Sequence, residues 1–151
     1  MTGNSTKEFD YSYLRDVVGH LAVIIFNRTT DMAMKHFTKI YLTTKEGTIL
    51  EFIANNPHAS QAEIAHETAT GTALLVRILD GLTRRGMLER EPSTESEDGE
   101  QYRLTEEGQS MRQPVRDSHF AGNTEMLERA GLFDEETQEL VRLLKKVVAG
   151  L

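Results

Sequence analysis

Two short motifs of the same kind, close together in the sequence, most constrain how this chain can fold. Thr43–Glu46 and Ser60–Glu63 each place a hydroxyl residue three positions before a glutamate. This is the capping-box pattern, in which the two side chains accept hydrogen bonds from backbone N–H groups at the start of a helix. The helix that begins after Thr43 should end near Asn55 to Pro57. The second motif should open a short helix containing Ile64.

A third helix and a β-hairpin are expected directly afterwards. The helix should run from Thr70 or Gly71 to Arg85 and stop at Gly86, since glycine adopts the left-handed conformation readily. Residues 87–90 and 101–104 alternate like paired strands, with the turn dipeptide Asp98-Gly99 between them. This order is typical of a winged helix-turn-helix, whose second helix lies in the major groove of DNA. A helical domain that happens to contain a hairpin fits the pattern as well.

Long helices are expected on both sides of this unit. The first should run from Tyr11 to about Met34, followed by a connector at 36–41. After the hairpin, Thr105 should start a helix that Pro114 kinks or breaks, and the helical pattern resumes at about 120–127 and ends near Gly131. Asp134 is expected to cap the last helix.

The last helix has an apolar stripe with little left in its own chain to cover it. The stripe consists of Leu140, Leu143, Leu144, Val147, Val148 and Leu151. Part of the first helix, from Leu14 to Ile25, has a similar stripe. Burial of such helices against a second copy across a two-fold axis predicts a homodimer. Packing on their own domain is the alternative.

The charge is uneven along the chain. Between Glu89 and Glu107, eight acidic and two basic residues carry −6 of the net charge of −7, so a basic surface elsewhere is not excluded. There is no cysteine, which excludes disulfides and thiol-based switching. No apolar run is long enough to cross a membrane, and the first ten residues lack the apolar core of a signal peptide. We therefore expect a cytoplasmic protein without membrane contact.

Four stretches resemble one known family in their order and spacing. They are Leu42-Thr43 with Ile49-Leu50, Ser60–Ala65, Arg77–Arg90 and Leu104–Gly108. With them the chain resembles the MarR (multiple-antibiotic-resistance) family of bacterial transcriptional regulators from Tyr11 to Leu151. The resemblance implies a mainly α fold with a small β-hairpin, in which a winged helix-turn-helix lobe (42–104) is joined to a helical dimerisation region (10–41 and 105–151). Residues 1–9 should form a flexible arm.

The same resemblance implies the function. Members bind double-stranded DNA as homodimers at pseudo-palindromic operators, mostly as repressors, and many release DNA when a small aromatic or anionic effector binds. Aligned on Leu82 and Gly86, the recognition helix exposes five residues near its start, of which only Arg77 is a donor suited to guanine: Gly71, Thr72, Ala73, Val76 and Arg77. Further DNA contacts are expected from Ser60, Gln61, Thr70 and Arg84, with added charge from Arg85 and Arg90. Capping by Ser60 and a solvated face for the arginines are the alternatives.

The chain departs from the family at three places. Leu74 stands where the family usually has Thr or Ser. The hairpin tip, Ser93 to Glu100, has no basic residue where members commonly carry Arg, which predicts weak operator binding dominated by the helix. Gly47 replaces a bulky residue of the family's ligand cleft, so a roomier pocket with His20, Phe26 and Phe37 nearby is one hypothesis. Core or dimer packing of these aromatic residues is the other.

Enzyme chemistry is not expected. The five histidines lack metal-binding spacing, and the sequence has neither a nucleophile elbow nor a phosphate-binding loop. We expect no cofactor and no metal. The alternative function is a dimeric protein-interaction module on the same scaffold, whose acidic wing no longer binds DNA.

Overall fold

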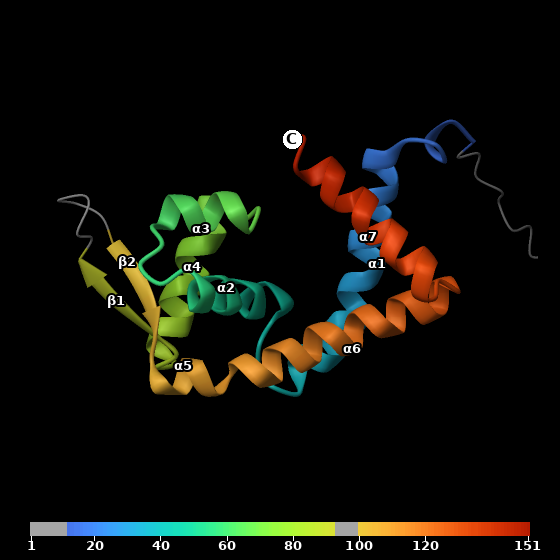
Figure 1. Cartoon of the computed structure of the whole chain (residues 1–151). Helices are drawn as coiled ribbons and strands as arrows, with labels where there is room; N and C mark the ends of the chain where they lie inside the picture. Colours follow the sequence, from blue (N-terminus) through green and yellow to red (C-terminus); the bar gives the residue numbers. More distant parts are fainter. Residues whose placement is uncertain (1–11, 93–99) are drawn as a thin grey trace, which may run out of the picture.

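The chain folds into a lobe of short helices with a hairpin and a separate arm of longer helices (Figure 1). This computed structural model describes residues 12–92 and 100–151. The elements in chain order are a 3₁₀ turn at Ser12–Leu14, α1 (Val18–Thr38), α2 (Thr44–Asn55), α3 (Gln61–Glu67), α4 (Thr72–Arg84), β1 (Leu88–Pro92), β2 (Glu100–Leu104), α5 (Glu106–Ser110), α6 (Arg112–Ala130) and α7 (Asp134–Val148). The mainly helical class with a small hairpin, predicted from the sequence, is confirmed.

The core of the lobe lies between α2, α3, α4 and the hairpin. Each element contributes apolar side chains that are at most 2% exposed: Ile49, Leu50, Ile53, Ile64, Leu75, Leu79, Leu82, Leu88 and Tyr102. In α4 the buried residues repeat at helical spacing, which leaves one face of this helix exposed. β1 and β2 pair antiparallel in the register Leu88 with Leu104 and Arg90 with Tyr102.

Both predicted capping boxes are present. The Thr43 hydroxyl accepts from the Glu46 N–H, and the Glu46 carboxylate accepts from the Thr43 N–H. The same reciprocal pair joins Ser60 and Glu63 at the start of α3. Gly86 follows the end of α4 and has a left-handed φ of +73°, as its residue type predicts. Local sequence chemistry therefore sets where α2, α3 and α4 begin and end.

The arm consists of α1, α6 and α7. α6 runs from the lobe to the crossing with α1, where Gly122 lies close to Ala33 (Figure 1). The expected break near Pro114 occurs at Met111, between α5 and α6, so Pro114 sits in the first turn of α6, where its missing N–H costs little. α6 ends at the left-handed Gly131, and none of the residues of α7 is buried.

Some predicted boundaries were wrong. α1 continues through His36 to Thr38, because Phe37 is anchored in the core, so the expected connector is shorter. α6 starts well before Phe120. Asp134 does not cap α7: Phe133 holds the cap position without a side-chain hydrogen bond, and Asp134 itself has φ of +37°. The flexible N-terminal segment expected at residues 1–9 and the turn expected at Asp98-Gly99 lie outside the described residues.

Gly108 in α5 is expected to be intolerant of any side chain. A Cβ built there would overlap the carbonyl oxygen of Met87, a backbone atom that also accepts from the Thr105 N–H. We expect Gly108→Ala to destabilise the protein by about 1–3 kcal/mol, because backbone must move to relieve the overlap. Gly81→Ala is the matched control: it meets open space inside α4 and should be neutral or stabilising by up to about 1 kcal/mol. Urea unfolding of both variants measures the difference, and equal stabilities would contradict the expectation.

Candidate nucleic-acid interface

The exposed face of α4 is the centre of the candidate site. Thr72, Ala73, Val76 and Arg77 are all exposed on this helix, and the opposite face is buried in the core. Arg77 makes no ion pair or hydrogen bond with any residue that the structure describes, so its guanidinium is available. Leu74, one of the three departures from the family pattern, is 42% exposed beside them. The structure thus brings together the predicted base-reading residues.

Thr70, one of the predicted DNA contacts, lies in the turn before α4. Thr70 is only 5% exposed, and its hydroxyl is bonded to that of Thr68 at 2.8 Å. The Lys45 ammonium donates to the Thr68 carbonyl oxygen at 2.9 Å and fixes the turn to α2. α4 begins at Thr72, so Thr70 lies inside the turn and its side chain is not on the exposed face. From the sequence, this helix was expected to begin at Thr70 or Gly71.

Ser60 and Gln61 are engaged within the protein. The Ser60 hydroxyl both accepts from the Glu63 N–H and donates to the Glu63 carboxylate, which is the capping alternative stated above. The Gln61 amide donates to Glu100 at 3.0 Å and to the Tyr102 hydroxyl at 3.1 Å, joining α3 to the hairpin. A phosphate contact from either side chain would have to replace these bonds.

The three arginines after Arg77 differ in their surroundings. Arg84 is exposed on the last turn of α4, and in the part of the chain that the structure describes it donates only to the Asp80 carbonyl oxygen of its own helix. Arg85 points back to the start of α2, where it pairs with Glu46 and donates to the Tyr41 carbonyl oxygen. Arg90 pairs with Asp80 and Glu100. Arg84 therefore adds free charge to the candidate site, whereas Arg85 and Arg90 are compensated.

The predicted ligand residues do not gather around one pocket. Phe37 is fully buried, and its ring occupies the space that the missing side chain of Gly47 leaves. Phe37 also meets the ring of His119 edge-on, with the ring centres 4.7 Å apart, and burial lowers the pKa of His119. His20 and Phe26 lie earlier on α1, and Phe26 is 64% exposed. The packing alternative thus describes Phe37, and the absence of a bulky residue at Gly47 does not widen a cleft there.

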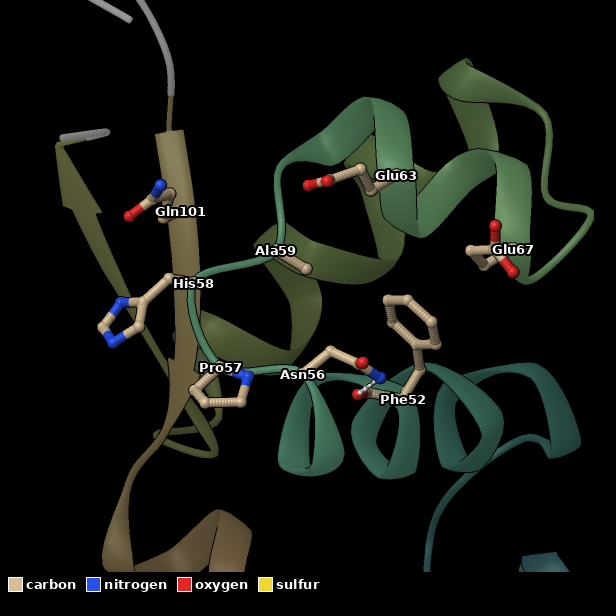
Figure 2. A pocket seen from close by; sticks show the side chains of 8 residues that line it. All are labelled: Phe52, Asn56, Pro57, His58, Ala59, Glu63, Glu67 and Gln101. Carbon is tan, nitrogen blue, oxygen red and sulfur yellow. Dashed lines mark hydrogen bonds between the residues drawn. The ribbon is translucent and has the colours of Figure 1, made fainter. Parts of the chain in front are cut away.

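A hollow of about 650 Å³ lies elsewhere, between the end of α2, the connector after it and α3 (Figure 2). Figure 2 shows Glu63 and Glu67 on the α3 side and Asn56 turned back to the Phe52 carbonyl oxygen. His58, at φ of +72°, lines it from the connector. None of the four predicted ligand residues lines this hollow. Among the described residues, we find no group of three or more metal-ligating side chains.

A charged cluster that sequence reasoning missed joins the lobe to the arm. Glu51 of α2 accepts from Arg112 at 3.1 Å and also pairs with Arg116, both in α6. Burial alone would raise the pKa of Glu51, but the hydrogen bonds from Arg112, Arg116 and Asn55 outweigh it and lower the pKa to about 2. The partners are 61 and 65 positions apart in sequence, so no local pattern could have revealed them.

Stability is therefore expected to fall in acid through this cluster. The folded pKa of Glu51 lies below the ordinary value of 4.5, so its contribution is present above about pH 4.5 and is lost as the pH falls towards 2. Allowing for solvent screening, we expect Glu51→Gln to cost on the order of 1–2 kcal/mol at neutral pH and much less near pH 2. The exposed pair of Glu139 with Arg142 supplies the control Glu139→Gln, which should change little. Denaturant unfolding across pH measures both, and a pH-independent effect of Glu51→Gln would oppose this assignment.

The geometry defines the class of protein. α3 and α4 form a helix-turn-helix, and the β1–β2 hairpin follows as the wing, with an exposed second-helix face beside it. The acidic tip of the wing, which includes Glu97 and Asp98, lies outside the described residues. In the parts of the chain that the structure describes, no helix is long and apolar enough to span a membrane. The fold is that of a winged helix-turn-helix protein.

Comparison with known proteins shows what the chain is similar to. A family model described as MarR family matches residues 42–97. No curated protein matches the sequence significantly. The MarR protein of E. coli, as a mutant complexed with operator DNA, has a similar structure with a TM-score of 0.78 at 21% identity, covering 92% of this chain and 99% of that one.

Two further structures have the same fold. BpsR of Bordetella bronchiseptica, described with regulation of its DNA binding by 6-hydroxynicotinic acid, has a TM-score of 0.77 at 19% identity and covers 87% of this chain and 98% of that one. A MarR family protein of Mycobacterium tuberculosis in complex with salicylic acid has a TM-score of 0.72 at 22% identity, covering 86% and 95%. A MarR family model thus matches the winged helix-turn-helix segment, and the fold is similar to that of MarR structures along nearly the whole chain.

Proposed function

We propose that this chain is a DNA-binding transcriptional regulator that acts as a homodimer and represses from a pseudo-palindromic operator. The single observation that carries the proposal is the exposed face of α4 beside the wing, with Thr72, Val76 and an Arg77 that has no partner within residues 12–92 and 100–151. Such a face fits the major groove, and Arg77 can pair with guanine. The similarity to a MarR protein complexed with operator DNA supports it.

In this proposal the arm is the dimerisation region and the lobe at 42–104 binds DNA. The support is the unburied α7, whose apolar residues Leu144, Val147 and Val148 are 47%, 48% and 72% exposed in the single chain. Large apolar surfaces of this kind mark protein interfaces. A two-fold axis through the arm would present two copies of α4 to successive major grooves. A regulator of this kind works in the cytoplasm and needs no catalysis.

We further propose that a small aromatic or anionic effector releases the DNA. The support is that similar structures are described with salicylic acid or with regulation by 6-hydroxynicotinic acid. Phe37 and Gly47 pack against each other, and His20 and Phe26 lie apart from them, so these four residues do not define where the effector binds.

Selection of sequences from a random duplex pool by the purified protein tests the function. We expect an enriched two-fold-symmetric site and an affinity that falls steeply as salt rises, since phosphate contacts release counterions. A folded dimer that enriches no sequence at low salt, with salicylate and other effectors absent, would contradict the proposal. That result would favour the protein-interaction module, for which the acidic side chains around the wing are the supporting feature.

A further inference from the structure

A closed polar network joins the wing to the helix-turn-helix. Glu100, at the start of β2, accepts from the Arg90 guanidinium at 3.1 Å through one carboxylate oxygen. Its other oxygen accepts from the Gln61 amide at 3.0 Å and from the Tyr102 hydroxyl at 3.1 Å. Asp80 of α4 completes the wing-base network by pairing with Arg90 at 2.5 Å. The five side chains, from α3, α4 and both strands, leave neither Arg90 nor Gln61 unpartnered.

The buried Tyr102 side chain holds the Glu100 carboxylate of this network in place. The residue is only 1% exposed, and the Arg90 guanidinium lies 5.8 Å from the centre of its ring. Burial raises the pKa of Tyr102, and the Glu100 carboxylate raises it further, so the hydroxyl stays a protonated donor. A buried donor aimed at Glu100 fixes the orientation of that carboxylate.

The network lies beside the surface that would face DNA. Arg77, Asp80, Thr83, Arg84 and Arg90 line a common hollow of about 590 Å³ on the exposed side of α4. Arg77 and Arg84 make no ion pair among the described residues, whereas Arg90 is shared between two carboxylates. Arg90, Asp80 and Glu100 together thus place one net negative charge where a phosphate backbone would approach. Carboxylates in such a position oppose binding.

Resting on the proposed function, we propose that Glu100 is a restraining residue of the DNA-binding surface. It holds Arg90 and Gln61 within the protein and adds a negative charge beside them, so that neither contacts phosphate and DNA binding is weaker than the fold permits. When the charge of Glu100 is removed, Arg90 retains a single carboxylate partner and can turn one edge of its guanidinium to a phosphate oxygen. The predicted groups Gln61 and Arg90 are therefore latent DNA contacts.

The test is a titration of a labelled random-sequence duplex by wild type and Glu100→Gln across a series of salt concentrations. The isosteric amide should bind on the order of three- to tenfold more tightly at low salt, with a log Kd against log salt slope steeper by about one phosphate contact. Adding Arg90→Gln to Glu100→Gln should abolish the gain, whereas Arg90→Gln alone should change the Kd by less than about twofold.

Glu89→Gln is the matched control for charge. Glu89 precedes Arg90 on β1, faces the other side of the strand and pairs with Arg103 at 2.5 Å, so the change removes one charge without touching the network. It should tighten binding by less than about twofold. Circular dichroism and thermal unfolding confirm that each variant is folded.

Three outcomes would overturn the inference: an unchanged slope for Glu100→Gln, a gain that survives Arg90→Gln, or an equal gain for Glu89→Gln. If wild type enriches an operator and the variants behave alike, only the restraint fails and the proposed function stands. If neither folded wild type nor Glu100→Gln binds any duplex at low salt, the regulator and the restraint both fail.

Discussion

Replacing Leu144 with Asp is expected to convert the proposed dimer into a monomer and to weaken operator binding by about 10²–10⁴-fold. Leu144 lies in the middle of the apolar stripe of α7, a helix that buries none of its residues in its own chain. A carboxylate there would have to be desolvated in the two-fold interface, and that cost greatly exceeds the value of the leucine packing it replaces. Without the dimer there is no second recognition helix, and the gain from bivalent binding disappears.

Sedimentation velocity gives the mass of the protein, and fluorescence anisotropy with the selected operator gives the affinity. Gln138→Asp introduces the same residue on the exposed, polar side of α7 and should leave both unchanged. The lobe core contains no residue of α7, so the lobe of the Leu144→Asp variant should remain folded by circular dichroism. A dimeric Leu144→Asp protein with normal affinity would show that α7 is not in the interface.

The lobe was predictable because its signals are local. Each capping box involves residues three positions apart, and a glycine that must adopt positive φ marks the end of α4 at Gly86. The buried positions of α4 follow from the spacing of four apolar residues. Such features depend little on the rest of the chain, and they predicted the helix-turn-helix, while the alternation of residues 87–90 and 101–104 predicted the wing.

The site was predictable only in part, because the tertiary fold determines which side chains contact one another. Thr72 and Arg77 were placed on the exposed face by aligning Leu82 and Gly86 with the family that the sequence resembles. Gln61 was expected to contact phosphate because it stands at a helix N-terminus, but its amide is bonded to Glu100, which is 39 positions away. Gly47 was interpreted as a gap, but Phe37 fills it from another helix. Sequence spacing shows which residues share a face, and it does not show what packs against that face.

Replacing Arg77 with Ala is expected to remove sequence preference at one base pair of each half-site. Arg77 is exposed on α4 without a partner among the described residues, and a bidentate pair with guanine contributes about 1–3 kcal/mol of discrimination. A dimer places two copies on one operator, so affinity for the selected site should fall by about 10²-fold or more. Binding to unrelated duplexes should fall much less, because their affinity comes from phosphate contacts.

Arg84→Ala separates base reading from phosphate contact. Arg84 is an exposed arginine on the same helix, bonded among the described residues only to the Asp80 carbonyl oxygen, and is expected to contact phosphate. Its removal should weaken all duplexes about equally and lower the salt slope by about one for each phosphate that is no longer neutralised. Repeating the duplex selection with both variants gives the specificity, and anisotropy at several salt concentrations gives the slope. If Arg77→Ala instead behaved as Arg84→Ala does, with an unchanged selected sequence, Arg77 would be a phosphate contact and Thr72 and Val76 would carry the base recognition.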